Sequence, residues 1–382
     1  MRAAFFTCAA LAVILSALGV PTNVPISKHA GSVKADSYIV KLKDGVSKES
    51  HLSTISSGFV AGSGVQYTYD NVFHGYAINL KGKDLDLLLQ SKDVEYILED
   101  GIASIEYYPG DEPAVAERSE PAVNHLSPRA NGSGVVVYGI DTGIYTAHST
   151  FGGRASWGAT FGGYANADGN GHGTHDVLKD TAGTAVGTTY GVATSARIVA
   201  IKVLSDAGSG AYSDIIAGVN WVVSNKGSSP AVATMSLGGS ANSALDSAIS
   251  SAISSGVHFS IAAGNSNVDA ANTSPARVTA ANTVGAVDSS NRKASFSNYG
   301  SILDVWALGV NVLSAWIGST TATNTISGAS MATPRVAGYL AVALGDYGSV
   351  SPASLSTSLK SHAAAVVTGA PSGTTNLLAQ RW

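Results

Sequence analysis

The chain has 382 residues, of which 45% are hydrophobic and 13% are charged, and its formal net charge is -4. This length suits two or three folded units, and the apolar content excludes a largely disordered chain. Because no basic surplus exists to neutralise phosphates, nucleic acid is not expected as a partner.

Residues 1–19 have the features of a secretory signal peptide. Arg2 gives a positive start, an apolar run extends from Ala3 to Val20, and small residues precede the predicted exit. At about 18 residues, the run is at the short limit for a membrane span. We therefore expect a secreted, extracellular protein with no membrane attachment once the signal is removed. Cys8 is the only cysteine, so the mature chain would have no disulfide.

Residues 36–108 predict a small α+β unit. Its strands and one helix are short, and they cover residues 38–42, 72–80, 83–91, 94–97 and 102–105. Residues 109–121, P-G-D-E-P-A-V-A-E-R-S-E-P, are rich in proline and acidic residues and indicate a linker.

Residues 122–382 are rich in Gly, Ala, Ser and Thr, and strand-like runs alternate with helical ones. The runs cover residues 135–140, 198–204, 213–225, 232–236, 243–255 and 258–263. This alternation predicts an α/β fold with a parallel sheet and helices on both of its faces. In such folds the functional groups gather at the carboxyl ends of the strands.

Four motifs together predict acyl transfer by a serine, which requires a base, a carboxylate to orient that base, and donors for the oxyanion. Asp141 lies in D-T-G-I, His172 in D-G-N-G-H-G-T-H, Ser330 in S-G-A-S-M-A-T-P, and Asn265 in A-A-G-N. The order Asp, His, Ser differs from the orders of the chymotrypsin and α/β-hydrolase arrangements.

Each motif alone has another interpretation. D-T-G also surrounds aspartic peptidase carboxylates, although the chain has no second D-T-G. His172 and His175 could bind a metal, although no third ligand has zincin spacing. Ser330 lacks the second glycine of a G-x-S-x-G elbow, and Asn265 could cap a turn.

In order, D-T-G-I, D-G-N-G-H-G-T-H, V-A-T-M-S-L-G-G, A-A-G-N-S-N and S-G-A-S-M-A-T-P-R-V-A-G resemble the subtilisin-like (subtilase) family, and most of all its fungal proteinase K-like branch. The resemblance covers residues 130–345, and residues 36–108 resemble the family's inhibitory propeptide. It implies that residues 122–382 form a subtilisin-like serine endopeptidase, which is made as a zymogen and cut within the linker.

The resemblance also implies residue roles. Ser330 would be the nucleophile, His172 the general base and then the general acid, and Asp141 the carboxylate that orients the imidazole. The Asn265 amide, with the Ser330 N–H, would bind the oxyanion. The walls around an extended, apolar or aromatic peptide substrate would comprise Gly208, Ser209, Gly210, Ser236, Leu237, Gly238, Gly239 and Gly264.

Further expectations concern metals, partners and modification. By resemblance, the Asp304 carboxylate and the carbonyls of Thr279 and Ala281 would hold a structural Ca²⁺, and no catalytic cofactor is expected. The partners would be protein or peptide substrates and the chain's own propeptide, and we expect a monomer. Asn131 and Asn272 begin glycosylation sequons.

The segment from Asp176 to Asp180, D-V-L-K-D, interrupts the family pattern G-T-H-x-A-G-T. It places charges where a buried helix should pass, and burying an unpaired charge there would cost roughly several kcal/mol. The segment should therefore loop out, or His172 should be displaced. The alternative function is a catalytically impaired paralogue with a binding or regulatory role. A gene-model error at a splice boundary would also produce this segment.

Overall fold

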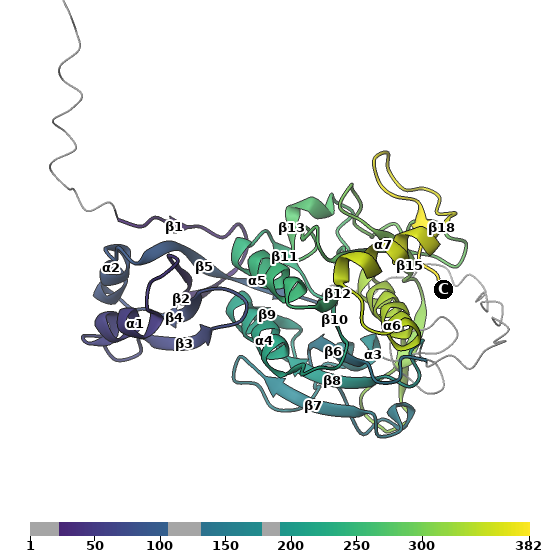
Figure 1. Cartoon of the computed structure of the whole chain (residues 1–382), viewed down its shortest axis with the longest axis horizontal. Helices are drawn as coiled ribbons and strands as arrows, with labels where there is room; N and C mark the ends of the chain where they lie inside the picture. Colours follow the sequence, from purple (N-terminus) through teal and green to yellow (C-terminus); the bar gives the residue numbers. More distant parts are fainter. Residues whose placement is uncertain (1–22, 106–130, 178–191) are drawn as a thin grey trace, which may run out of the picture.

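The structure is a computed structural model that describes residues 23–105, 131–177 and 192–382. The predicted signal peptide, the predicted linker with its cleavage site, and residues 178–180 of the inserted segment lie outside the described residues. Figure 1 shows two units end to end, an N-terminal unit of residues 23–105 and a C-terminal unit that begins at residue 131. No helix in these three ranges is both long enough and apolar enough to cross a membrane.

The N-terminal unit is one sheet with two helices. The strands follow the order β1-β5-β2-β4-β3, with β1 parallel to β5 and the other pairs antiparallel. The elements are β1 (Ile26–Ser27), β2 (Val33–Leu42), α1 (Lys48–Ser56), β3 (Gly64–Tyr69), β4 (Gly75–Asn79), α2 (Lys83–Leu89) and β5 (Val94–Ser104).

One detail of this unit differs from the sequence prediction. The strands predicted at 94–97 and 102–105 are a single strand, β5, which runs through the acidic pair Glu99 and Asp100. Asp100 is fully buried within it and accepts three hydrogen bonds, so a residue that usually disfavours strands is stabilised here by tertiary contacts.

The C-terminal unit is built on a nine-stranded sheet of order β18-β19-β15-β14-β12-β10-β6-β8-β7. All of its neighbouring pairs are parallel except β18 with β19. The sheet strands are β6 (Val136–Asp141), β7 (Ala155–Thr160), β8 (Arg197–Lys202), β10 (Ala231–Met235), β12 (Val257–Ala262), β14 (Asn282–Val287), β15 (Val305–Leu308), β18 (Ala364–Ala365) and β19 (Leu377–Leu378).

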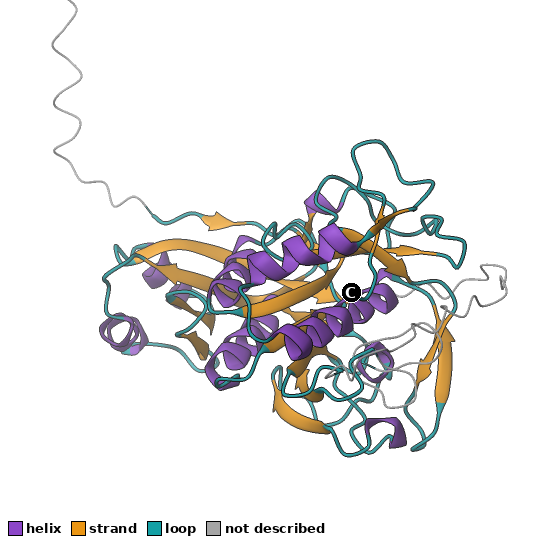
Figure 2. Ribbon diagram, turned by 45° about the vertical axis from the view of Figure 1, so that its right-hand side comes forward, coloured by secondary structure: helices purple, strands orange, loops and turns teal. Residues whose placement is uncertain are grey.

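Among its described residues, this unit also has five α-helices and several short strands, and Figure 2 shows helices on both sides of the strands. The helices are α3 (His172–Asp176), α4 (Tyr212–Asn225), α5 (Ser243–Ser254), α6 (Ala329–Tyr347) and α7 (Pro352–His362), with 3-10 turns at Ser149–Phe151 and Ala270–Asn272. The short strands are β9 (Ser209–Ala211), β11 (Gly239–Ser240), β13 (Thr273–Ser274), β16 (Val312–Ala315) and β17 (Thr323–Ile326).

Side chains of β6 show how the sheet separates two cores. Successive strand residues point to opposite faces. Val137 joins the core beneath α6, whereas Tyr138 and Ile140 join the core beneath α4 and α5. The predicted α/β class with helices on both faces is therefore confirmed.

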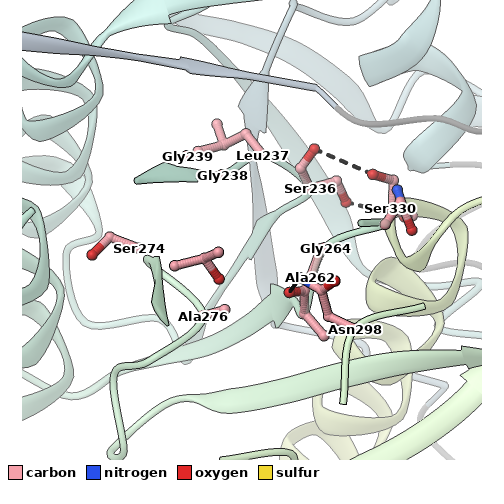
Figure 3. A pocket seen from close by; sticks show the side chains of 13 residues that line it. Ser236, Leu237, Gly238, Gly239, Ala262, Gly264, Ser274, Ala276, Asn298 and Ser330 are labelled. Carbon is pink, nitrogen blue, oxygen red and sulfur yellow. Dashed lines mark hydrogen bonds between the residues drawn. The ribbon is translucent and has the colours of Figure 1, made fainter. Parts of the chain in front are cut away.

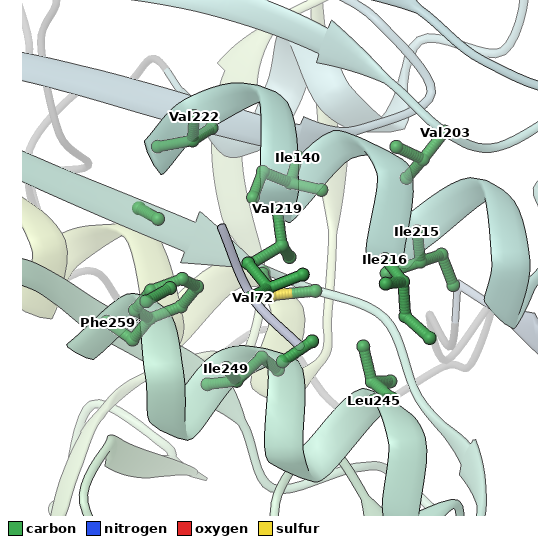
Figure 4. Close-up of a cluster of buried hydrophobic side chains, with 14 of the residues drawn as sticks. Val72, Ile140, Val203, Ile215, Ile216, Val219, Val222, Leu245, Ile249 and Phe259 are labelled. Atoms are coloured by element: carbon green, nitrogen blue, oxygen red, sulfur yellow. The ribbon is translucent and has the colours of Figure 1, made fainter. Parts of the chain in front are cut away.

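The second of these cores is shared by the two units. Val72 of the N-terminal unit lies among the labelled side chains of α4 and α5 in Figure 4 and is 1% exposed. Tyr69 and Ile39 belong to the same buried cluster. Burial of this apolar surface holds the N-terminal unit against α4 and α5, close to the edge where the candidate site lies.

Candidate active site

Asp141 and His172 meet at the carboxyl end of the central strand β6. Asp141 is the last residue of β6 and His172 is the first residue of α3. The His172 Nδ1 lies 2.9 Å from the Asp141 Oδ1, and the backbone N–H of Thr142 donates to the same oxygen at 2.6 Å. Both side chains are buried, so their interaction is only weakly screened by solvent.

The loop that presents His172 is organised by Asp168, a residue to which the sequence prediction assigned no role. Its carboxylate accepts hydrogen bonds from the Thr142 hydroxyl at 2.9 Å, from the Gly171 N–H at 2.8 Å, and from the Thr174 hydroxyl at 2.6 Å. Asp168 opens the motif D-G-N-G-H-G-T-H, and this acidic first residue was the sequence feature that could have indicated its role. Only the structure shows that it ties the loop to the strand end.

Close packing explains the glycine after His172. A Cβ atom on Gly173 would lie 2.2 Å from the carbonyl oxygen of Gly143, and the Gly173 N–H donates to the Thr142 hydroxyl at 2.9 Å. The start of α3 can thus approach the D-T-G turn only without a side chain at this position.

Ser330 is the second residue of α6, which begins across the site from α3. Its hydroxyl donates to the Ser236 carbonyl over 3.4 Å, and the Ser236 hydroxyl donates to the Ser330 carbonyl at 3.0 Å. Within the described residues, the buried His172 Nε2 has no hydrogen-bond partner. The structure thus joins Asp141 to His172 by a hydrogen bond and links Ser330 to the end of β10.

Asn265 follows the end of β12 and is anchored to the start of α6. The Ala329 N–H donates to the Asn265 Oδ1 at 2.6 Å. Because an N–H group needs an acceptor, this bond identifies which end of the amide is oxygen.

Asp176 places a second carboxylate beside the imidazole. It is 2% exposed, and its Oδ2 lies 3.7 Å from the His172 Nδ1. Burial raises the pKa of the Asp176 carboxyl well above its usual range, and this effect outweighs the opposing charge of His172. Burial would lower the pKa of His172, but the negative charges of Asp141 and Asp176 raise it to about 9.

This position corrects one expectation about the inserted segment. Asp176 does not loop out: it continues α3 and is buried, and the next residue, Val177, is 1% exposed in the core beneath α6. His172 is nevertheless held against Asp141. Asp141, His172 and Asp176 bring possible ligand atoms within 4.8 Å of one another. The 2.9 Å contact is a hydrogen-bond distance, however, so we assign the cluster to proton chemistry.

A pocket with uncharged walls lies beside Ser330 (Figure 3). Ser330 and Ser236 stand at one end and Ser274 at the other. The predicted residues Ser236, Leu237, Gly238, Gly239 and Gly264 all line it, together with Ala262, Ala263, Asn265, Thr273, Ser274, Ala276, Asn298 and Ser330. Asn298, which the sequence prediction did not include, shapes one wall, since its Nδ2 donates to the Ala263 carbonyl at 2.7 Å.

The end of β5 lies as an added strand between the two predicted walls. Ala103 pairs with Gly210 and Ser104 with Ser209 in an antiparallel ladder. On the other side, the N–H of Ser104 donates to the Gly238 carbonyl and the Gly238 N–H donates to the Ser104 carbonyl, both at 3.0 Å. The N-terminal unit therefore occupies backbone groups of the two segments predicted from the sequence as walls of the substrate cleft.

Other predicted positions lie away from this cluster. The Nε2 of His175 bonds the carbonyls of Val312 and Asn324, so this nitrogen holds β16 and β17 and does not join His172 as a metal ligand. The Asn131 amide oxygen accepts from Arg381 at 2.7 Å, whereas Asn272 is exposed at the end of a 3-10 turn.

The predicted calcium carboxylate has a different partner. The Asp304 Oδ1 lies 2.8 Å from the Lys360 Nζ, and its Oδ2 accepts from the Thr283 N–H at 2.9 Å. The ammonium group balances the charge of the carboxylate, so the arrangement does not fit a calcium ligand unless Lys360 is displaced. The other two predicted ligands, Thr279 and Ala281, lie just before β14. Thr283, whose N–H donates to Asp304, is the second residue of that strand.

Comparison with known proteins extends over most of the chain. Residues 132–379 match the subtilase family and residues 37–106 match peptidase inhibitor I9. Subtilisin-like protease 2 of Pseudogymnoascus destructans is 44% identical over 368 residues, which are 92% of this chain and 91% of that protein. Proteinase R of Parengyodontium album is 41% identical over 327 residues, 83% of this chain and 81% of that protein.

A solved structure agrees with these relatives. The crystal structure of a cold adapted subtilisin-like serine proteinase is 45% identical and has a TM-score of 0.63, and the match covers 70% of this chain and 96% of that one. With the hydrogen-bonded Asp141 and His172 and the strand-like insertion of β5, these matches confirm the predicted family. The chain belongs to the subtilase family and is a serine endopeptidase that carries an I9 inhibitor propeptide.

Proposed function

We propose that residues 122–382 form a secreted endopeptidase that hydrolyses peptide bonds through Asp141, His172 and Ser330. The observation that carries this proposal is the 2.9 Å contact between the His172 Nδ1 and the Asp141 Oδ1, formed where β6 meets α3. The contact sets the imidazole tautomer with the proton on Nδ1, which leaves Nε2 as the base.

In the proposed mechanism, the Ser330 Oγ attacks the scissile carbonyl carbon while the His172 Nε2 takes the hydroxyl proton. Asp141 stabilises the resulting imidazolium. The imidazolium then gives its proton to the leaving amine, which departs and leaves an ester on Ser330. Water, deprotonated by His172, hydrolyses the ester in the second half of the reaction.

The oxyanion of each tetrahedral intermediate would lie between two donors. The backbone N–H of Ser330 lies in the first turn of α6, at the positive end of the helix dipole. The Nδ2 of Asn265 would be the second donor, held in place through the bond from the Ala329 N–H to Oδ1. Donors fixed before the reaction stabilise the developing charge without reorganisation.

The uncharged pocket predicts which side chain is preferred just before the scissile bond. None of its lining residues carries a charge. An unpaired lysine or aspartate side chain would lose its hydration there, so we expect kcat/KM to be about 100-fold higher for phenylalanine or leucine than for either. A series of peptide nitroanilides that differ only at this position would measure the ratio, and equal rates for lysine would contradict the assignment.

We propose that the N-terminal unit inhibits the enzyme until the chain is cut in the linker, residues 109–121. Asp100 is central to its attachment. The Asp100 carboxylate accepts from the Ser213 N–H at 2.9 Å and from the Ser213 hydroxyl at 2.6 Å, and it also accepts from Ser37 within its own unit at 2.7 Å. These bonds join β5 to the first turn of α4.

Replacing Asp100 with alanine in a separately added propeptide should therefore weaken inhibition. Loss of a buried charged acceptor leaves the Ser213 N–H unpaired, so we expect about 2–3 kcal/mol, or roughly a 30- to 150-fold increase in the inhibition constant. Asp44→Ala, which changes an exposed carboxylate in the turn after β2, is the matched control and should leave the constant unchanged. Equal inhibition by both variants would contradict this role.

The proposals on secretion and glycosylation rest on the sequence, and the residues proposed to bind calcium fit that ion only in part. Residues 1–19 would direct secretion, and Asn272 is the better exposed of the two proposed glycosylation sites. A structural Ca²⁺ at Asp304, Thr279 and Ala281 would require that Lys360 leave the carboxylate.

Active-site labelling tests the proposed function directly. The mature protein is treated with a fluorophosphonate, and the modified residue is located by peptide mapping. We expect one label, on Ser330, together with loss of casein hydrolysis. Failure to label Ser330 in a folded protein would exclude the proposed mechanism.

The buried Asp176 favours a second candidate function, a catalytically impaired paralogue that binds peptides. In this candidate function, the Asp176 carboxylate, 3.7 Å from the His172 Nδ1, keeps the base protonated. Deleting residues 176–180 discriminates between the two. A change from no activity to strong activity would support impairment of the full chain, whereas substantial activity before and after deletion would remove this candidate.

A further inference from the structure

The clearest unexplained feature of the site is the contact between Asp176 and His172. The two residues are four positions apart on α3, a spacing that puts side chains on the same face of a helix. The Asp176 Oδ2 lies 3.7 Å from the same nitrogen, Nδ1, that bonds Asp141. Within the described residues, neither carboxylate oxygen of Asp176 makes a hydrogen bond of ordinary geometry, although the Ser236 hydroxyl is near enough to oppose the rise in the pKa of this carboxyl.

The charged groups that face His172 are all acidic. Asp141 approaches from β6, Asp168 from the loop before α3, and Asp176 from α3 itself. The buried ammonium of Lys202 is directed elsewhere, to the Thr142 carbonyl at 2.6 Å and to Asp206 at 2.8 Å. The nearby side chains of Ser236, which follows β10, and of Ser330, on α6, carry no charge, and each hydroxyl donates to the carbonyl of the other residue.

We propose that Asp176 is a second carboxylate partner of His172, which shares one proton with the imidazole and confines hydrolysis to alkaline pH. This inference rests on the proposed function, because it assigns Asp176 a role through the proposed general base. Asp176 touches neither the substrate nor the reacting atoms in that mechanism, so it is a positioning residue.

The number of protons that His172 and Asp176 hold together shows how Asp176 changes the pH dependence. With Asp141 ionised, the pair His172 and Asp176 carries one proton, either on the imidazole or on the carboxyl, and the net charge is the same in both forms. Removing that proton leaves two buried carboxylates and no cation. That state is disfavoured by burial and by repulsion between Asp141 and Asp176.

The consequence for catalysis follows from the location of the proton. While it resides on His172, the imidazole cannot accept the proton of Ser330. The pKa of His172 agrees with this direction: burial lowers it, but the charges of Asp141 and Asp176 raise it to about 9, so the imidazole holds its proton to a higher pH than an isolated histidine does.

The test compares the wild-type mature enzyme with Asp176→Asn. The amide has nearly the same shape but no charge, so the acid limb of kcat/KM for a neutral peptide substrate should move to lower pH by about 1 to 3 units. Asp288→Asn is the matched control, since it makes the same change in a largely buried carboxylate that pairs with Arg292, and it should not move the limb. The pH dependence of Ser330 labelling by a fluorophosphonate should shift in parallel.

An unchanged acid limb in a fully active Asp176→Asn enzyme would overturn the proposal. If Ser330 is not labelled in either protein at any pH, the proposed function itself fails, which is a different result. If the variant does not fold, the low-field proton resonance of His172 in the wild-type enzyme decides: titration well above pH 7 supports the shared proton. Titration near the ordinary value of 6.5 overturns it.

Discussion

Replacing Ser330 with alanine is expected to lower kcat for peptide hydrolysis by about a million-fold. The substitution removes the oxygen that forms the acyl bond and leaves the oxyanion donors and the pocket in place, so the remaining rate should be that of binding and electrostatic stabilisation alone. The methyl group fits where the Ser330 side chain is 2% exposed, and its hydroxyl bond to Ser236 is long, at 3.4 Å. Stability should therefore change little.

Two measurements check this prediction. Hydrolysis of a peptide nitroanilide gives kcat, and the mass of the purified protein shows whether the linker has been cut. If maturation is autocatalytic, the alanine variant should retain its propeptide. Ser250→Ala is the matched control, because it makes the same change at an exposed position on α5. A Ser330→Ala protein with near-normal turnover would contradict the assignment of the nucleophile.

Replacing Asn265 with alanine should lower kcat by about 100- to 1,000-fold, with little change in KM. The Nδ2 donor is proposed to bind the oxyanion, which exists only in the transition state and the intermediate. Its loss therefore affects kcat and leaves ground-state binding almost unchanged. The measurement is a full kinetic comparison on one peptide substrate at a pH where His172 is unprotonated.

Asn265→Asp separates this catalytic role from a structural one. Aspartate keeps the oxygen that accepts from the Ala329 N–H, but it places an anion where the donor stood. If Asn265 only anchors α6, aspartate should restore activity. If it binds the oxyanion, aspartate should be at least as damaging as alanine, while the melting temperature remains closer to that of the wild type.

The elements of the catalytic fold could be predicted where local pattern and packing agree. The helix predicted at 213–225 is observed as Tyr212–Asn225, and the strand predicted at 258–263 is observed as Val257–Ala262. The helix has the apolar periodicity of a half-buried helix, whereas all six residues of the strand are buried, which agrees with a central strand covered on both faces. The prediction was wrong at β5, where a buried Asp100 continues a strand that the sequence pattern interrupts.

The sequence by itself determined the family, the α/β class and the identity of the proposed triad, because residue type and motif order are local properties that carry this information. The tertiary structure alone decided which side chains share a site. Asp168 and Asp176 are both acidic neighbours of His172 in sequence, yet one binds the loop through hydrogen bonds and the other lies against the imidazole. That difference depends on the course of α3 and on burial. The same two factors determine whether the charge of each carboxylate is balanced by hydrogen-bond donors or acts on the base.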